Sequence, residues 1–164
     1  MYKIVFIILT LSVFQANGQD KKKLVQNGNK MYSDSSYNEA EINYRKALEK
    51  DQEYFKAKFN MGDAIYKQGR YNESTAIFKA LANEEISDKE RAYIYHNLGN
   101  SLLKEQKIKE AIESYKNALR TNPNDEDTRY NLVYAQQMLK QQEQQEQQEQ
   151  QEQQEQQEQQ EQQE

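Results

Sequence analysis

The stretch MGDAIYKQGRYNESTAIFKAL, residues 61–81, decides the fold because its residue pattern occurs three times in the chain. The aligned positions are Gly28, Gly62 and Gly99, then Tyr37, Tyr71 and Ile108, then Tyr44, Phe78 and Tyr115, then Ala47, Leu81 and Ala118. The first two copies are 34 residues apart, and the third follows after 37 because three residues are added around Glu84–Lys89. A period of this length with helical spacing inside it indicates a solenoid of helix-turn-helix repeats.

The spacing predicts an all-α fold with three pairs of helices and a seventh helix. Turns are expected at Asp34–Ser36, whose short polar side chains favour turns, and at Gly69, because glycine readily adopts the left-handed conformation that ends a helix. Pro123 stops the sixth helix, and Asp125–Asp127 place negative charge at the positive end of the seventh. The expected helices are Lys21–Ser33, Tyr37–Lys50, Tyr54–Gln68, Tyr71–Asn83, Lys89–Glu105, Ile108–Thr121 and a last helix over residues 126–140.

The repeated small residues have a reason in packing. A glycine allows two helix backbones to approach closely, so Gly28, Gly62 and Gly99 are expected where the helices of each pair cross. The residues predicted to face these glycines or to fill the space between repeats are Ala40, Ser74, Ala111, Tyr44, Phe78, Tyr115, Leu48 and Leu119. The last helix has an apolar side at Leu132, Ala135 and Leu139 and a polar opposite side, which predicts a solubilising cap.

Two end segments are expected to lie outside this body. Residues 1–18 contain Lys3, an apolar run over 4–14 and the sequence Ala16-Asn17-Gly18, which is typical of a secretory signal peptide cleaved before Gln19. An uncleaved anchor is the alternative. Residues 141–164 are eight copies of QQE without any apolar residue, so we predict an extended or weakly helical solvated tail without a core. An assembly segment is the alternative for this tail, because Gln-rich tracts self-associate.

The charge of the chain resides mainly in the tail. The full sequence has 22 basic and 27 acidic residues, of which the tail contributes eight acidic ones. Without the tail and Lys3, 21 basic and 19 acidic residues remain. A nearly neutral body argues against nucleic-acid binding, which needs a basic face.

The sequence offers no set of residues for catalysis. It has one histidine, His96, and no cysteine, so neither a disulfide nor a cluster of metal ligands is expected. No glycine-rich phosphate loop occurs, because the glycines fall at packing positions inside helices. We therefore predict that the protein is not an enzyme and uses no cofactor and no metal.

Residues 98–123, LGNSLLKEQKIKEAIESYKNALRTNP, closely resemble a tetratricopeptide repeat, and the resemblance extends over about residues 21–140. It implies repeats at about 21–54, 55–88 and 92–125, the cap helix 126–140, and a right-handed superhelix. In this family the first helix of each repeat lines a concave groove that binds an extended segment or a helix of a partner protein. The resemblance therefore implies a protein or peptide partner.

The predicted groove carries amides at repeating positions. Gln26, Asn60 and Asn97 each lie two residues before a packing glycine, and Asn131 continues this row in the cap helix. A carboxamide offers donors and an acceptor together, so such a row can bind the main chain of an extended peptide. The other groove residues expected to bind a partner are Asn29, Asp63, Asn100, Tyr66, Tyr93 and Tyr130, and the same surface holds Tyr32, Phe59, His96 and Tyr134. Solvation of a groove wall is the alternative role for these polar residues.

One known class of partner is excluded by substitution. Tetratricopeptide domains that bind the acidic C-termini of heat-shock chaperones use a clamp of lysine, asparagine, asparagine, lysine and arginine. The corresponding residues here are Val25, Asn29, Asn60, Tyr93 and Asn97. Both asparagines match but all three cations are missing, so the charge-assisted bonds to terminal carboxylates are lost.

The arrangement of signal peptide, three repeats, the cap sequence DTRYNLVYAQQMLK (residues 127–140) and a Gln/Glu-rich end resembles the BatC proteins of the Bacteroides aerotolerance group. This resemblance implies a periplasmic adaptor that joins membrane-anchored von Willebrand A-type proteins and contributes to oxygen or stress tolerance. The alternative is a structural protein that self-assembles through the QQE tail or an open end of the solenoid.

Overall fold

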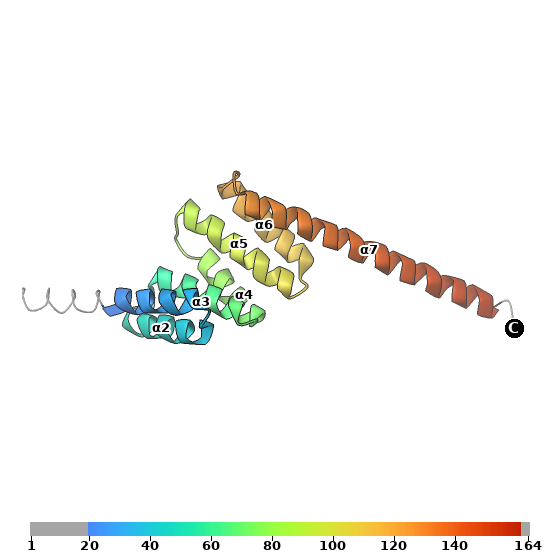
Figure 1. The fold of residues 1–164 in the computed structure, drawn as a ribbon. Coiled ribbons are helices and arrows are strands. Elements are labelled where there is room, and N and C mark those ends of the chain that lie inside the picture. The colour runs from blue at the N-terminus through green and yellow to red at the C-terminus, as the bar shows by residue number, and fades with distance from the viewer. Residues whose placement is uncertain (1–19, 162–164) are drawn as a thin grey trace, which may run out of the picture. The chain divides into compact units, whose positions relative to one another are not determined.

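The computed structural model describes residues 20–161, so the signal peptide predicted at 1–18 lies outside the described residues. Within 20–161 the regular structure consists of seven α-helices and contains no strand, in agreement with the predicted all-α class (Figure 1). The chain divides into two compact units, one ending at Ser87 and the other beginning at Asp88. Each unit is described separately.

The first unit contains two helical pairs. Its helices cover residues 20–33, α2 (Tyr37–Lys50), α3 (Phe55–Lys67) and α4 (Tyr71–Ala82), all within one or two residues of the predicted bounds. One buried cluster of this unit consists of Val25, Ala40, Tyr44, Ala47, Ala57 and Ala64, of which Ala40, Tyr44 and Ala47 are positions of the repeat pattern. Small side chains dominate this core, so the helices approach closely and a single aromatic ring fills much of the space between them.

The second unit contains α5 (Asp88–Lys104), α6 (Ile108–Thr121) and α7 (Glu126–Glu161). Ile94, Leu98 and Leu102 form a buried stripe on α5 at intervals of four residues, which is the spacing of one helix face. The start of α7 packs on α6 and α5 through Ala135 and Thr128, both fully buried. This contact gives the cap helix its predicted place.

The three packing glycines each lie directly against the aromatic residue of their own repeat. A methyl group placed on Gly99 would come within 2.5 Å of the Tyr115 ring, and one on Gly62 within 2.9 Å of the Phe78 ring. Gly28 stands in the same relation to Tyr44. The predicted close approach is therefore confirmed. The nearest neighbour of each glycine is the aromatic ring, whereas the sequence predicted the small residue on the opposite helix. That small residue also makes contact in the second repeat, where the Ser74 hydroxyl donates to the Gly62 carbonyl at 3.0 Å.

The turns inside the three repeats share one backbone form. Gly69 ends α3 with a φ of 79°, as predicted, and its counterparts Ser35 and Gln106 have φ values of 59° and 61°. In each turn the next residue, at position 36, 70 or 107, donates its N–H to a carbonyl five residues earlier. The short side chains at 34–36 do not cap the following helix, because Ser36 makes no side-chain cap bond. Backbone hydrogen bonding, rather than Ser36, closes that turn.

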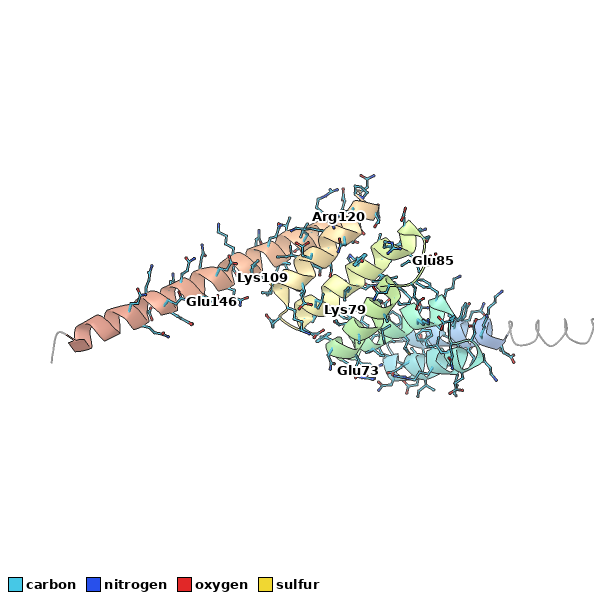
Figure 2. The ribbon with its side chains drawn as sticks, turned by 180° about the vertical axis from the view of Figure 1, so that it is seen from behind. Glu73, Lys79, Glu85, Lys109, Arg120 and Glu146 are labelled. Atoms are coloured by element: carbon cyan, nitrogen blue, oxygen red, sulfur yellow. The ribbon has the colours of Figure 1, made fainter. Side chains whose placement is uncertain are left out.

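The cap helix does not end near residue 140. Contrary to the predicted extended or weakly helical tail, α7 continues through the QQE repeats to Glu161. The repeats contain no glycine or proline, and glutamine and glutamate are good helix formers, so nothing in them stops a helix that has already begun. Gln142 donates to Glu146 one turn later at 2.9 Å. Figure 2 shows α7 running along α6 from near Arg120 past Lys109, with Glu146 on the part beyond α6.

The outer side of the cap is less polar than predicted. Tyr130 is 72% exposed, and Val133 and Tyr134 are also exposed. The tyrosine hydroxyls give this side a polar fringe, but its rings remain accessible. Within residues 20–161 no helix combines the length and apolar character that a membrane crossing requires.

Candidate peptide-binding site

In the first unit Asn29 is the centre of a small hydrogen-bond network. Its side-chain oxygen accepts a bond from the Tyr44 hydroxyl at 2.9 Å and another from the Asn60 amide at 2.8 Å. Two donors occupy the oxygen, so the NH₂ group of Asn29 must point away from both. Asn29 is exposed, and no hydrogen bond from its NH₂ group is found among the described residues. The side chain is therefore held in one orientation with two donors available to a ligand.

The second unit repeats this network with the same spacing. The Asn100 oxygen accepts a bond from the Tyr115 hydroxyl at 2.8 Å and from the Asn131 amide at 3.0 Å. The donors again lie 15 and 31 residues after the acceptor, as Tyr44 and Asn60 do after Asn29. The structure therefore brings Asn29 together with Asn60 and Asn100 together with Asn131. It gives Asn60 and Asn131 a supporting role that the predicted amide row did not include.

The first unit has a pocket of about 200 Å³ beside the Asn29 network. It is lined by Asn29, Tyr32, Ser33, Tyr44, Asn60 and Asp63. The Ser33 hydroxyl does not donate to the Asp63 carboxyl group, because it donates to the Asn29 backbone carbonyl at 3.0 Å. Asp63 is thus the one ionisable acid among the lining residues.

The Asp63 carboxyl has an unusual environment. Loss of solvent raises its pKa from 3.8 to about 7, and the charge of Lys67 offsets this only in part. Asp63 occupies the position in the second repeat that Asn29 and Asn100 occupy in the first and third. Asn29 and Asn100 each accept a hydrogen bond from a tyrosine hydroxyl 15 residues later. The residue 15 positions after Asp63 is Phe78, which has no hydroxyl. No hydrogen bond or ion pair to the Asp63 carboxyl is found within residues 20–161. The second repeat therefore places an acid where its own ring does not supply a proton donor.

The remaining predicted site residues have different surroundings. Gln26 and Tyr93 are exposed, Asn97 is half-buried, and Tyr130 is open to solvent. Tyr66 packs its ring 5.3 Å from Tyr71, and burial raises its pKa. Among the additional groove residues, Phe59 lies between Phe55 and Phe78 with ring centroids 5.9 and 5.6 Å apart, so it serves packing.

A second pocket, in the second unit, lies at the start of α7. It has a volume of about 460 Å³ and is lined by Tyr93, His96, Asn122, Asn124, Asp125, Glu126 and Asp127. His96 Nδ1 lies 2.6 Å from the Thr128 hydroxyl oxygen, and burial lowers the pKa of His96. Asp125 accepts the Thr128 backbone N–H at 3.0 Å, so this carboxylate caps α7 as the sequence indicated.

No group of three or more metal-binding side chains occurs in the described part of the chain. The roles that sequence reasoning missed are those of Tyr44 and Tyr115, which we expected only as core residues. Both are buried, yet each hydroxyl reaches an asparagine. A signal for this existed, because asparagine and tyrosine recur 15 residues apart in the first and third repeats.

Comparison with known proteins identifies the repeats. Two family models, each described as a tetratricopeptide repeat, match residues 32–90 and 92–125. The chain is 28% identical over 120 residues to the "Protein STIP1 homolog" of Dictyostelium discoideum, a match that covers 71% of this chain. It spans only 21% of that relative's length.

Solved structures show the same fold. The complex "TPR2AB-domain:pHSP90-complex of yeast Sti1" matches with a TM-score of 0.69 and 25% identity, covering 77% of this chain and 50% of that one. The first TPR domain of RPAP3, bound to the HSP90 peptide SRMEEVD, matches with a TM-score of 0.68 and 21% identity over 74% of this chain and 94% of that one. The chain is therefore built of tetratricopeptide repeats and carries a protein–protein interaction domain of that family.

Proposed function

We propose that this protein is an adaptor, and that each of its two units binds an extended segment of a partner protein through the asparagine at the centre of that unit's own hydrogen-bond network. The observation that carries this proposal is the saturation of the Asn29 and Asn100 oxygens by two donors each. A side chain held in this way presents its NH₂ group without losing rotational freedom on binding, which lowers the cost of association. Main-chain carbonyls of a peptide are the matching acceptors.

The ligand of this adaptor is not an acidic C-terminal tail. Among the structural relatives, the Sti1 and RPAP3 domains were solved with HSP90 peptides, and the RPAP3 peptide ends in EEVD. In this chain the positions of the clamp cations hold Val25, Tyr93 and Asn97, and Val25 is buried. Asp63 lines the pocket next to Asn29 and Asn60, so a terminal carboxylate placed there would meet another acid. A carboxylate there would further disfavour the ionised form of Asp63, whose pKa burial already raises to about 7.

The adaptor is further proposed to act in the periplasm. The support is the signal-like sequence over residues 1–18 together with the resemblance of the cap and Gln/Glu-rich end to the BatC proteins. The partners would then be membrane-anchored von Willebrand A-type proteins, and the phenotype would be oxygen or stress tolerance. Mass spectrometry of the native protein tests the export step: a chain that begins at Gln19 supports it, and a retained Met1–Gly18 contradicts it.

The binding site is tested by changing donors while keeping acceptors. Asn29→Asp with Asn100→Asp preserves an oxygen for Tyr44, Asn60, Tyr115 and Asn131 but removes both outward NH₂ groups. Asn72→Asp on the exposed side of α4 adds one negative charge without touching a network and serves as control for each of the two single changes. The probe is the partner segment mapped by cross-linking of periplasmic and membrane extracts, titrated calorimetrically. We expect the double variant to bind about ten- to a hundredfold more weakly, since each neutral bond contributes about 0.5–1.5 kcal/mol.

Equal affinity of wild type and double variant, with equal melting temperatures, would move the site away from these asparagines. Salt dependence supplies an independent measurement, because neutral hydrogen bonds respond weakly to ionic strength. A steep loss of affinity in high salt would indicate binding through charges instead.

Self-assembly through the QQE tail is the second candidate, and the observation in its favour is the continuous helix α7. The residues of α7 from 141 to 154 are all exposed, but none of them is apolar, so they provide no hydrophobic seam for a partner helix. Size-exclusion chromatography with and without residues 141–164 decides between the candidates. A monomer in both forms contradicts assembly, whereas a larger species that disappears on truncation supports it.

A further inference from the structure

The pocket around Asp63 has features of a site for one charged group. Its carboxyl group lies with Asn29, Tyr32 and Asn60 around an open volume of about 200 Å³. Small-molecule sites usually exceed about 300 Å³, so this space suits a single side chain rather than a cofactor. In the described residues every fully buried polar side-chain atom has a hydrogen bond. The Asp63 oxygens have none, so they are not fully buried and remain accessible from the pocket.

The donors next to Asp63 are largely committed elsewhere. The Tyr44 hydroxyl and one N–H of Asn60 are bonded to the Asn29 oxygen, and the Ser33 hydroxyl is bonded to a backbone carbonyl. Among the described residues, Lys67, four residues along α3, is the charged group that acts on Asp63, and it is exposed. The carboxyl group is thus poorly compensated in the free protein, which agrees with its raised pKa of about 7.

We propose that this pocket binds the positively charged side chain of a lysine or arginine from the segment that the domain holds, with Asp63 as the counter-charge. The inference rests on the proposed adaptor function. An ammonium or guanidinium group would form charge-assisted hydrogen bonds to the carboxylate, which are about twice as strong as neutral ones. The apolar stem of such a side chain lies favourably along aromatic rings, and Tyr32 and Tyr44 provide them.

Other ligand classes fit less well. An anion would face the Asp63 carboxylate. A divalent metal ion such as calcium needs six to eight oxygen ligands, and no group of three acidic or histidine side chains occurs in the described residues. A purely apolar side chain would remove water from Asp63, Asn29 and Asn60 without replacing their hydrogen bonds.

The cationic pocket is tested with defined probes on the full chain. Four alanine pentapeptides, acetylated and amidated at their ends, carry lysine, arginine, norleucine or glutamate at the central position. A fifth peptide contains only alanine and has a free N-terminal amine as its one positive charge. Binding is followed by NMR through the side-chain amide signals of Asn29 and Asn60, and the Asp63 carboxyl is titrated by its ¹³C shift. The lysine and arginine peptides are expected to shift these signals and to bind about tenfold or more tightly than norleucine. The free-amine peptide shows whether a chain terminus serves equally well, and binding by that peptide alone overturns the side-chain assignment.

Bound cation stabilises the ionised form, so the lysine peptide should lower the titration midpoint of Asp63 and bind more weakly at pH 5 than at pH 8. Burial raises the pKa of Tyr32 and of Tyr44 to about 12, so both hydroxyls remain neutral over this range. Asp63→Asn should weaken the lysine peptide about tenfold or more and leave norleucine within about twofold. Glu49→Gln, on the exposed side of α2, removes the same charge and should change neither.

Equal binding of lysine and norleucine, or an Asp63 midpoint that the lysine peptide does not move, overturns the pocket proposal. The midpoint is measured on wild type, so it decides even if Asp63→Asn folds poorly. The two proposals fail separately. Suppose that the partner segment binds more weakly to the Asn100→Asp variant, but the peptides show no preference for lysine. These results would support the adaptor function and contradict the cationic pocket.

Discussion

Arg70 Nη1 lies 2.7 Å from Glu41 Oε2, and this ion pair joins the turn before α4 to helix α2 of the preceding repeat. The same carboxylate accepts bonds from Gln68 at 2.8 Å and from Arg45, while Arg70 also pairs with Glu73. Burial alone would raise the pKa of Glu41, but the hydrogen bonds from Gln68 and Arg45 outweigh it and lower the pKa. The charge at Glu41 therefore contributes to holding the first two repeats together.

Glu41→Gln should lower the stability of the chain by about 1–3 kcal/mol, because the amide retains the shape but removes the charged acceptor of Arg45 and one of the two charged acceptors of Arg70. Urea unfolding followed by circular dichroism measures the effect. Glu39→Gln, an exposed neighbour on α2 that makes no ion pair among the described residues, should change stability by less than about 0.5 kcal/mol. A loss of similar size in both variants would assign the effect to general charge instead of the Glu41 network.

Asp63 should make stability fall as the pH rises from about 4 to about 7. Its folded pKa of about 7 lies above the unfolded value of 3.8, so the folded state binds more protons in this window. Asp63→Asn should then be more stable than wild type at pH 8, by an amount on the order of a few kcal/mol, and nearly equal at pH 4. Glu41 acts in the opposite sense, since its lowered pKa makes its contribution disappear as the pH falls through that value. Melting curves across pH 3–9 would refute the Asp63 assignment if the two chains remained parallel.

Gly99→Ala should be more destabilising than Gly62→Ala. The added methyl would meet the Tyr115 ring at 2.5 Å, and that ring is fully buried and tied to Asn100 by its hydroxyl. Overpacking of this kind costs about 1–3 kcal/mol, of which better helix propensity returns up to about 1. At Gly62 the nearest ring atom is 2.9 Å away and Phe78 has no hydroxyl to anchor it, so a smaller loss is expected. Thermal melting of the two variants measures the difference, and equal melting temperatures would contradict it.

Gln106→Gly should stabilise the third repeat. Gln106 has a φ of 61°, a conformation that costs a non-glycine residue about 1 kcal/mol or more, and its counterpart Gly69 adopts it freely. We expect a gain of about 0.5–1 kcal/mol, reduced by the greater freedom of glycine in the unfolded chain. The reciprocal change Gly69→Ala should be destabilising by a similar amount, and its sign is the control. A gain in both variants, or in neither, would show that the left-handed turn is not the cause.

Removal of residues 141–164 should leave the melting temperature of the repeats nearly unchanged. The ion pair from this segment to the body is the exposed pair Lys109 and Glu143 at 3.9 Å, and Gln142 lies beside the start of α6; exposed ion pairs contribute about 0–1 kcal/mol. The same deletion should reduce the helical signal at 222 nm by the share of the chain that α7 loses. Lowering the pH should raise that signal in the full chain, because protonation relieves repulsion between glutamates on the free helix. A helical signal that deletion leaves unaltered would show that the QQE segment is not helical in solution.

The sequence alone determined the repeats, the helices and their turns. Gly28, Gly62 and Gly99 with Tyr44, Phe78 and Tyr115 recur at one spacing, and solenoid contacts join neighbours in the chain, so a local period is enough to specify which faces meet. The left-handed turn at Gly69 followed from glycine itself. The length of α7 could not be predicted from the sequence, because the QQE segment has no apolar face whose period would indicate a helix. The segment is helical because it extends a helix whose first turns are stabilised by packing on the body.

The tertiary structure decided what the polar residues do. The sequence predicts Asn60 and Asn131 as ligands of a partner, and the tertiary structure adds that one N–H of each donates to the Asn29 or the Asn100 oxygen. Asp63 looked like one more groove residue, and only its enclosure by the pocket, with Phe78 in place of a tyrosine, left its carboxyl poorly solvated. Hydrogen bonds and desolvation depend on atom positions to within a fraction of an ångström, and residue spacing specifies a helix face but not those positions.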